Sequence, residues 1–122
     1  MITLLAVAAA AAAGAVARYI LDQYVRYRRP GVFPRGIWLV NITGSFVLGL
    51  VVGLGARHGL PAQVVTILGA GFCGAYTTFS TFSYELVYLC EKGQVRTSLL
   101  YAAVSLAAGV TAAASGLAVG AL

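Results

Sequence analysis

The stretch that decides the fold is residues 69–83, GAGFCGAYTTFSTFS, in which three glycines are followed by five hydroxyl residues in seven positions. Glycine in a helix interior costs about 1 kcal/mol relative to alanine, and Ser and Thr side chains can bond back to helix carbonyls. The stretch nevertheless lies in an uncharged block long enough to cross a bilayer. We therefore expect a transmembrane helix broken near the membrane midplane, where protein or a cavity surrounds the freed backbone groups.

The rest of the chain divides into similar uncharged blocks. The 122 residues are 61% hydrophobic and only 9% charged, whereas a soluble domain carries about 25% charged residues. Blocks 2–17, 36–56, 59–84 and 97–122 contain no Asp, Glu, Lys or Arg, and about 20 apolar residues suffice to cross a bilayer core. The sequence predicts an all-α integral membrane protein with one domain, residues 1–122. Its spans are expected at about 2–21, 36–56, 62–90 and 97–120.

The charged and sulfur-containing residues exclude several classes of partner. The formal net charge is +5, but the cations lie in short turns, where positive charge sets orientation in the membrane. Because no basic domain lies outside the bilayer, nucleic acid is not an expected partner. Cys73, Cys90 and the single His58 lack the spacing of metal ligands.

Two of the spans carry small and polar side chains four residues apart, which places them on one face of each helix. The Gly49 and Gly53 pair is typical of close helix packing, and Asn41 and Ser45 of hydrogen bonds between helices. Polar groups inside a membrane also line water-filled paths. The residues alone therefore indicate a small ion channel or transporter. The two stripes are Asn41, Ser45, Gly49 and Gly53, and Thr97, Tyr101, Ser105 and Gly109.

Several motifs resemble those of a known family. TTFSTF over residues 77–82 is similar to the signature of the Fluc/CrcB fluoride channels, while GAVARY over 14–19 and NITGSFVLG over 41–49 match elements of their first two spans. Tyr101 and Ser105 match the fourth span. Ala75 stands where the family usually has a second glycine, and alanines replace glycines in the first span. Alanine is small enough for the resemblance to hold over nearly the whole chain.

The resemblance implies an assembly and a location. It implies an antiparallel dimer, of identical or sister chains, in the lipid of a bacterial plasma membrane. Two fluoride pathways would lie at the dimer interface, and passive export would lower cytoplasmic fluoride. By the same resemblance, backbone carbonyls of Gly74 and Thr77 hold a structural Na⁺ at that interface, in keeping with the oxygen ligands that hard cations prefer.

A fluoride pathway has to replace the ion's lost water with hydrogen-bond donors. Phe79 and Phe82 fall on one helical face and can present electropositive ring edges to an anion, although a pair of phenylalanines in a membrane helix usually serves packing. Arg18 either raises the anion concentration at a pore mouth or anchors the span at the interface. The candidate donors are Asn41, Tyr101, Ser105 and, further along the third span, Ser80, Thr81 or Ser83.

Other functions stay open on the residues alone. A small four-span proton-coupled multidrug-type exporter needs an intramembrane carboxylate, whereas Asp22 ends the first span and Glu85 lies toward the end of the third. A scaffold subunit without conduction is disfavoured by the polar stripes and the expected break. An enzyme is disfavoured because the chain offers no paired acid and base and no nucleophile with an orienting His.

The distribution of positive charge predicts the orientation of the chain. Basic residues dominate the turns on one side, which places those turns in the cytoplasm and both termini outside. A mainly single orientation in turn predicts a sister subunit of reversed charge bias. The cations on the basic side are Arg26, Arg28, Arg29, Arg35, Lys92 and Arg96, against Arg57 and His58 on the other.

Overall fold

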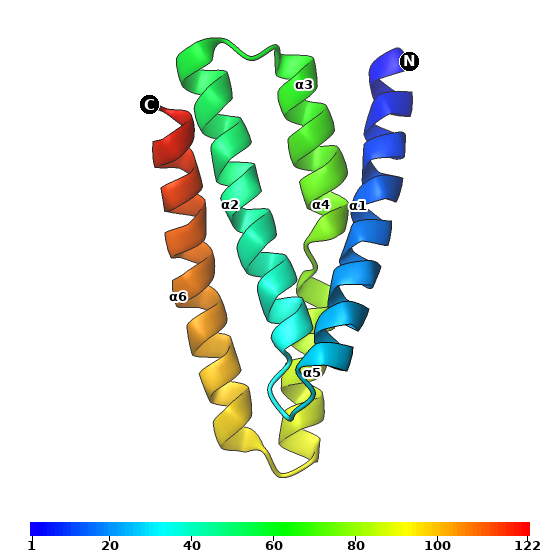
Figure 1. Ribbon diagram of the computed structural model, residues 1–122, viewed down its shortest axis with the longest axis vertical. Helices are drawn as coiled ribbons and strands as arrows, with labels where there is room; N and C mark the ends of the chain where they lie inside the picture. The colour runs from blue at the N-terminus through cyan, green and yellow to red at the C-terminus, as the bar shows by residue number, and fades with distance from the viewer.

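Four long helical segments lie alongside one another in the computed structural model, which describes residues 1–122 (Figure 1). Three of them are the uninterrupted helices α1 (Ile2–Arg28), α2 (Arg35–His58) and α6 (Val95–Gly120). The remaining segment consists of α3 (Ala62–Thr66), η1 (Ile67–Cys73), α4 (Gly74–Tyr76) and α5 (Phe79–Glu91). All four are long and apolar enough to cross a membrane. The prediction of a four-span, all-helical membrane protein is confirmed, and both termini lie at the same end.

The first helix is longer than the sequence pattern predicted. We expected the span to end near Leu21 and a polar turn to follow, but α1 continues to Arg28. One reason is an ion pair one helical turn apart, because Arg26 Nε donates to Asp22 Oδ1 over 3.0 Å. The helix then ends ahead of Pro30, as expected from the restricted backbone of a residue that precedes proline.

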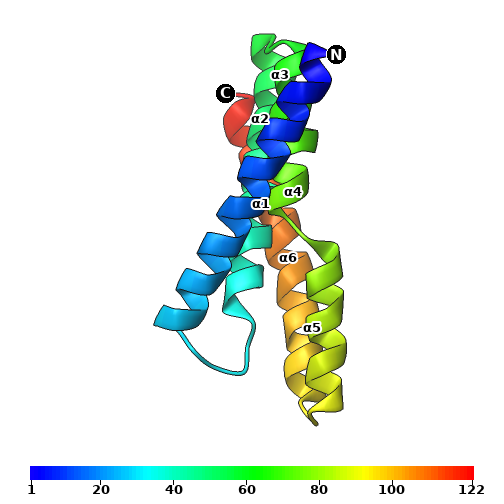
Figure 2. The same ribbon diagram turned by 90° about the vertical axis from the view of Figure 1, so that its right-hand side faces the viewer.

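The third span is interrupted where the hydroxyl residues begin. The glycine-rich stretch stays helical but widens into a π-helix over Ile67–Cys73, a geometry that is frequent at functional sites. After α4 the chain becomes extended at Thr77 and Thr78, with ψ angles of 160° and 123°. This break lies near the middle of the 30-residue segment, and Figure 2 shows the open link between α4 and α5. The expected interruption of this span is therefore present.

Glycines allow α2 and α6 to approach each other closely. A Cβ atom on Gly49 would collide with the carbonyl oxygen of Ala113, and one on Gly53 would press on the backbone of Gly120. In the other direction, a Cβ atom on Gly116 would collide with the carbonyl oxygen of Phe46. The interpretation of Gly49 and Gly53 as a helix-packing seam is confirmed.

The outer surface of the bundle is apolar. Val40, Cys73 and Tyr101 are the largest fully buried side chains, so the interior of a single chain is small. Large hydrophobic side chains such as Leu99 and Leu106 are exposed along the spans. A surface of this kind suits contact with lipid or with another membrane chain.

Candidate functional site

A groove of about 540 Å³ lies between α2, α5 and α6, beside the break in the third span. It brings together four residues that the sequence singled out as ion-pathway candidates, Asn41, Phe79, Phe82 and Ser105. Parts of the two stripes predicted on separate spans thus meet at one surface, Asn41 and Ser45 from α2 and Ser105 and Gly109 from α6. The rest of the lining is small or apolar, with Gly44, Ser45, Leu48, Thr77, Thr78, Leu86, Ala102, Leu106 and Gly109.

Asn41 joins α2 to the break through both ends of its amide. Its Nδ2 donates to the carbonyl oxygen of Thr78 over 3.0 Å, and the N–H of Thr78 donates to Asn41 Oδ1 over 2.8 Å. The side chain therefore serves both polar backbone groups of an extended residue. Because an amide nitrogen carries two hydrogens, one N–H of Asn41 remains for another acceptor.

Thr78 begins α5 as its N-cap. Its Oγ1 accepts from the N–H of Thr81 over 3.2 Å, the usual way to satisfy a free donor at a helix start. The same oxygen lies 3.3 Å from Ser80 Oγ, and Ser83 Oγ donates back to the carbonyl of Phe79. Ser80, Thr81 and Ser83 do not line the groove, so the structure does not bring these candidate donors together with the others. The sequence analysis did not identify Thr78 as a helix cap. The available signal was its position three residues before Thr81, the spacing at which an N-cap hydroxyl accepts from a backbone N–H.

Aromatic rings run in series from the groove toward the loop between α1 and α2. Phe79 and Phe82 have ring centroids 5.9 Å apart, and Phe79 is 80% exposed. Phe82 meets Tyr101 edge-on at 5.0 Å, and Tyr101 meets Phe33 edge-on at 5.3 Å. Phe79 is thus free to contact lipid, an ion or a second chain, whereas Phe82 is also a packing element.

Tyr101 lies outside the lining of the groove, in a charged network. Its side chain is fully buried, and its hydroxyl donates to Glu85 Oε1 over 2.9 Å. Arg26 Nη2 donates to the other carboxylate oxygen of Glu85 over 3.0 Å, while its Nε bonds to Asp22. The Tyr101 hydroxyl is thereby committed to a carboxylate. Sequence reasoning missed this network, although the four-residue spacing of Asp22 and Arg26 was a signal for part of it.

Ser105 contributes a hydroxyl without a partner to the groove. Its Oγ is buried and has no hydrogen-bond partner within the chain. Buried polar atoms are nearly always paired, and a hydroxyl is both donor and acceptor. Ser105 therefore brings to the groove wall a hydrogen-bonding group that the chain itself leaves unused.

The backbone around the break offers carbonyl oxygens, and Arg18 reaches one of them. Thr77 O accepts from Arg18 Nη1 over 3.3 Å, which places Arg18 beside the break. In an α-helix the N–H of Thr78 would bond to Gly74 O, but it donates to Asn41 instead. A Cβ atom on Gly74 would meet only Gly69 O, at 3.7 Å. The carbonyl oxygens of Gly74 and Thr77 are of the type that binds hard cations. Arg18 already uses one lone pair of the Thr77 oxygen.

Comparison with known proteins identifies the family of the chain. Residues 5–117 match the sequence profile of the family described as CrcB-like protein, Camphor Resistance (CrcB). The chain belongs to the CrcB family. It is similar to a relative from Leifsonia xyli, "Fluoride-specific ion channel FluC 1", at 54% identity over 81% of this chain and 72% of the relative. A protein of the same name from Frankia casuarinae is 46% identical over 96% of this chain and 92% of its own length. "Fluoride-specific ion channel FluC 2" from Bacillus cereus is 38% identical over 98% of both chains.

Proposed function

We propose that this chain is the subunit of a passive, fluoride-selective ion channel. The observation that carries the proposal is the groove, where the Asn41 amide and the unpartnered Ser105 hydroxyl share one lining with Phe79 and Phe82. The names of the relatives from Leifsonia and Frankia support the choice of fluoride. No covalent step is needed for this activity, and we propose no enzymatic one.

The chemistry of the groove suits a small, strongly hydrated anion. Donors have to replace the water that fluoride loses, and Asn41 and Ser105 each offer one hydrogen that the chain does not use. Ring edges of Phe79 and Phe82 add positive potential without binding the ion irreversibly. The apolar remainder of the lining, such as Leu48 and Leu106, keeps the path narrow and gives a larger anion no compensating donors.

A second subunit would close this groove. Polar groups that face hydrocarbon are costly, yet the groove is open along one side of the chain. We infer that an antiparallel partner covers it, so that each pathway lies at the interface between two chains. Phe79, which is 80% exposed, is positioned to contribute to such an interface.

A structural sodium ion fits the carbonyls at the break. Gly74 and Thr77 would hold it through their backbone oxygens, and two chains would supply a set of four. Arg18 donates to Thr77 O in the single chain. That oxygen has a second lone pair, so the guanidinium and a cation could both contact it. The repulsion between the two positive charges would then have to be offset by further oxygen ligands on the cation. We therefore propose sodium only at the assembled interface.

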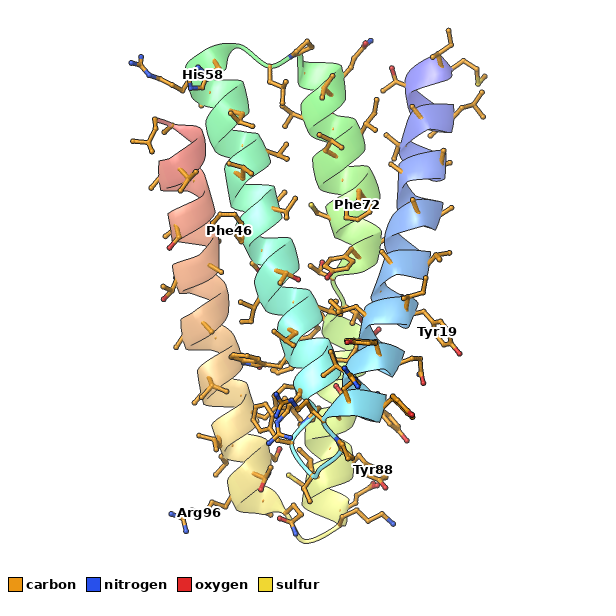
Figure 3. All side chains as sticks on the ribbon, in the orientation of Figure 1. Tyr19, Phe46, His58, Phe72, Tyr88 and Arg96 are labelled. Atoms are coloured by element: carbon orange, nitrogen blue, oxygen red, sulfur yellow. The ribbon has the colours of Figure 1, made fainter.

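The charge bias bears on orientation and on the identity of the partner. Arg96, near the turn before α6, and His58, at the end of α2, mark opposite ends of the bundle (Figure 3). The end that holds Arg96 also holds Arg28, Arg29 and Arg35. The positive-inside rule would place that end in the cytoplasm of a bacterial plasma membrane, which favours a sister chain of reversed bias as the partner. Accessibility labelling of a C-terminal cysteine in intact cells tests this, after Cys73 and Cys90 are replaced. Equal labelling from both sides would instead support a dual-topology homodimer.

Anion efflux from liposomes that contain the purified protein tests the function. We expect fluoride to leave passively and chloride to be retained, in neutral and in proton-loaded vesicles alike. The alternative is a proton-coupled exporter, in which Glu85, which accepts hydrogen bonds from Arg26 and Tyr101, would have to serve as the intramembrane carboxylate. Equal flux of both anions, or uphill transport driven by a proton gradient, would overturn the channel proposal.

A further inference from the structure

A basic cavity of about 530 Å³ lies at the end of the bundle opposite the two termini. It is separate from the ion groove, with which it shares no lining residue. Its walls come from the end of α1, the loop before α2, the start of α2, the second half of α5 and the turn before α6. Four cations line it, Arg26, Arg29, Arg35 and Lys92, with Glu85 as the only carboxylate.

Most of this positive charge is not neutralised within the chain. Arg26 forms ion pairs with Asp22 and Glu85, whereas Arg29, Arg35 and Lys92 form none, because these two are the only salt bridges present. Three cations from different elements therefore converge on one cavity without a counter-ion. Such a cavity favours an anionic ligand with several oxygens, and Arg in particular matches the geometry of a phosphate group.

An apolar groove of about 300 Å³ adjoins the basic cavity. Phe33 and Arg35 line both of them. The other walls of the groove come from Trp38 and Leu39 on α2 and from Leu100 and Val104 on α6, so it follows the outer surface of two spans. A cationic cavity that passes into an apolar groove has the polarity of a phospholipid, with a charged head followed by an acyl chain.

We propose that this composite surface binds one anionic phospholipid. The headgroup phosphate lies in the basic cavity against Arg35 and Arg29, and an acyl chain lies in the groove along Leu100 and Val104. Basic pockets between spans on the cytoplasmic side are suited to anionic headgroups. The polarity of the groove excludes free phosphate as the preferred ligand, because phosphate would leave the apolar half unused.

Native mass spectrometry of the full chain in mild detergent can test this proposal. Titration with phosphatidylglycerol should give saturable binding at least tenfold tighter than titration with phosphatidylcholine. Arg35→Gln should weaken the binding of phosphatidylglycerol about fivefold, the effect expected for loss of one cation near an anionic headgroup. Arg96→Gln is the matched control, because Arg96 is at the same end but outside the cavity and points away from the bundle (Figure 3). It should leave binding unchanged.

Three further arms make the outcome decisive. Arg29→Gln repeats the test at a second cation, and fluoride efflux from phosphatidylcholine vesicles checks that each variant still assembles. Inorganic phosphate should fail to displace the lipid at millimolar concentration. The proposal is overturned if phosphatidylcholine binds equally well, if Arg96→Gln weakens binding as much as Arg35→Gln, or if inorganic phosphate displaces the lipid. The last result would identify the cavity as a site for free phosphate.

Discussion

Replacement of Asn41 by leucine should loosen the break in the third span. The substitution keeps the number and branching of the side-chain heavy atoms but removes both hydrogen bonds to Thr78, of 2.8 and 3.0 Å. Thr78 is only 8% exposed, so water cannot readily replace its lost partner. A buried donor left unpaired costs about 1–3 kcal/mol. If that cost appears as local opening, the amide of Thr78 should exchange its hydrogen roughly 5- to 150-fold faster.

Hydrogen–deuterium exchange of the peptide that contains Thr78 measures this effect. Thr43→Val is the matched control, because Thr43 is on the same helix and its hydroxyl contacts the carbonyls of Leu39 and Val40 and the Tyr76 hydroxyl. It bonds to neither Thr77 nor Thr78. Exchange at Thr78 should stay at the wild-type rate in that control. Unchanged exchange in Asn41→Leu would refute the reasoning that Asn41 holds the break.

Asn41→Asp separates the structural role from a role in conduction. The carboxylate can still accept from the N–H of Thr78, but an ionised carboxylate cannot donate. We expect exchange at Thr78 to change less than in Asn41→Leu while fluoride efflux is abolished, and Asn41→Ser to retain some efflux. Normal efflux through the Asp variant would mean that Asn41 does not face the ion.

The remaining predictions concern the rings, the helix seam and the cation. Phe79→Ile and Phe82→Ile should both lower fluoride efflux sharply. Only Phe82→Ile should also lower the free energy of unfolding, by about 1 kcal/mol, because Phe82 packs edge-on against a buried tyrosine. Wild-type efflux in both folded variants would mean that the two rings serve only in packing. Gly49→Ala should destabilise the fold by about 1–3 kcal/mol. Gly109→Ala is the control and should not, because its added Cβ would meet nothing closer than 3.9 Å. Equal unfolding temperatures for the two variants would contradict the close packing of α2 on α6 through Gly49. Exhaustive replacement of sodium by a large organic cation during assembly should remove efflux, and full activity would exclude a structural sodium ion.

The spans and the position of the break were predictable because they depend on local composition. Absence of charge over some 20 residues selects a bilayer environment, and glycine followed by Ser and Thr weakens a helix wherever it occurs. The helix of the first span continues to Arg28, past the expected end of the span near Leu21. Its last turns contain the ion pair between Asp22 and Arg26, which supports the helix by about 0.2–0.5 kcal/mol.

The assignment of hydroxyls to the groove was less predictable, because it depends on where the helix restarts. Each residue turns an α-helix by about 100°, so a restart displaced by one position rotates every following side chain to another face. With α5 starting at Phe79, the rings of Phe79 and Phe82 line the groove while Ser80 and Thr81 take part in the cap. The pairing of Asn41 with Thr78 joins residues 37 positions apart, and no pattern along the chain encodes that distance.

The carbonyl of Thr77 and both polar backbone groups of Thr78 are served from neighbouring helices of the same chain. Arg18 on α1 donates to Thr77 O, and Asn41 on α2 pairs with both the N–H and the carbonyl of Thr78. Unpaired backbone groups are not tolerated in the membrane core. Because the groups at Thr77 and Thr78 are paired within one chain, the break can form before a second subunit binds. The second subunit that we propose would then close the groove without being needed to create it. A variant that folds but fails to dimerise should therefore keep the wild-type exchange rate at Thr78 while it loses fluoride efflux. Faster exchange at Thr78 in such a monomer would show that the break depends on assembly.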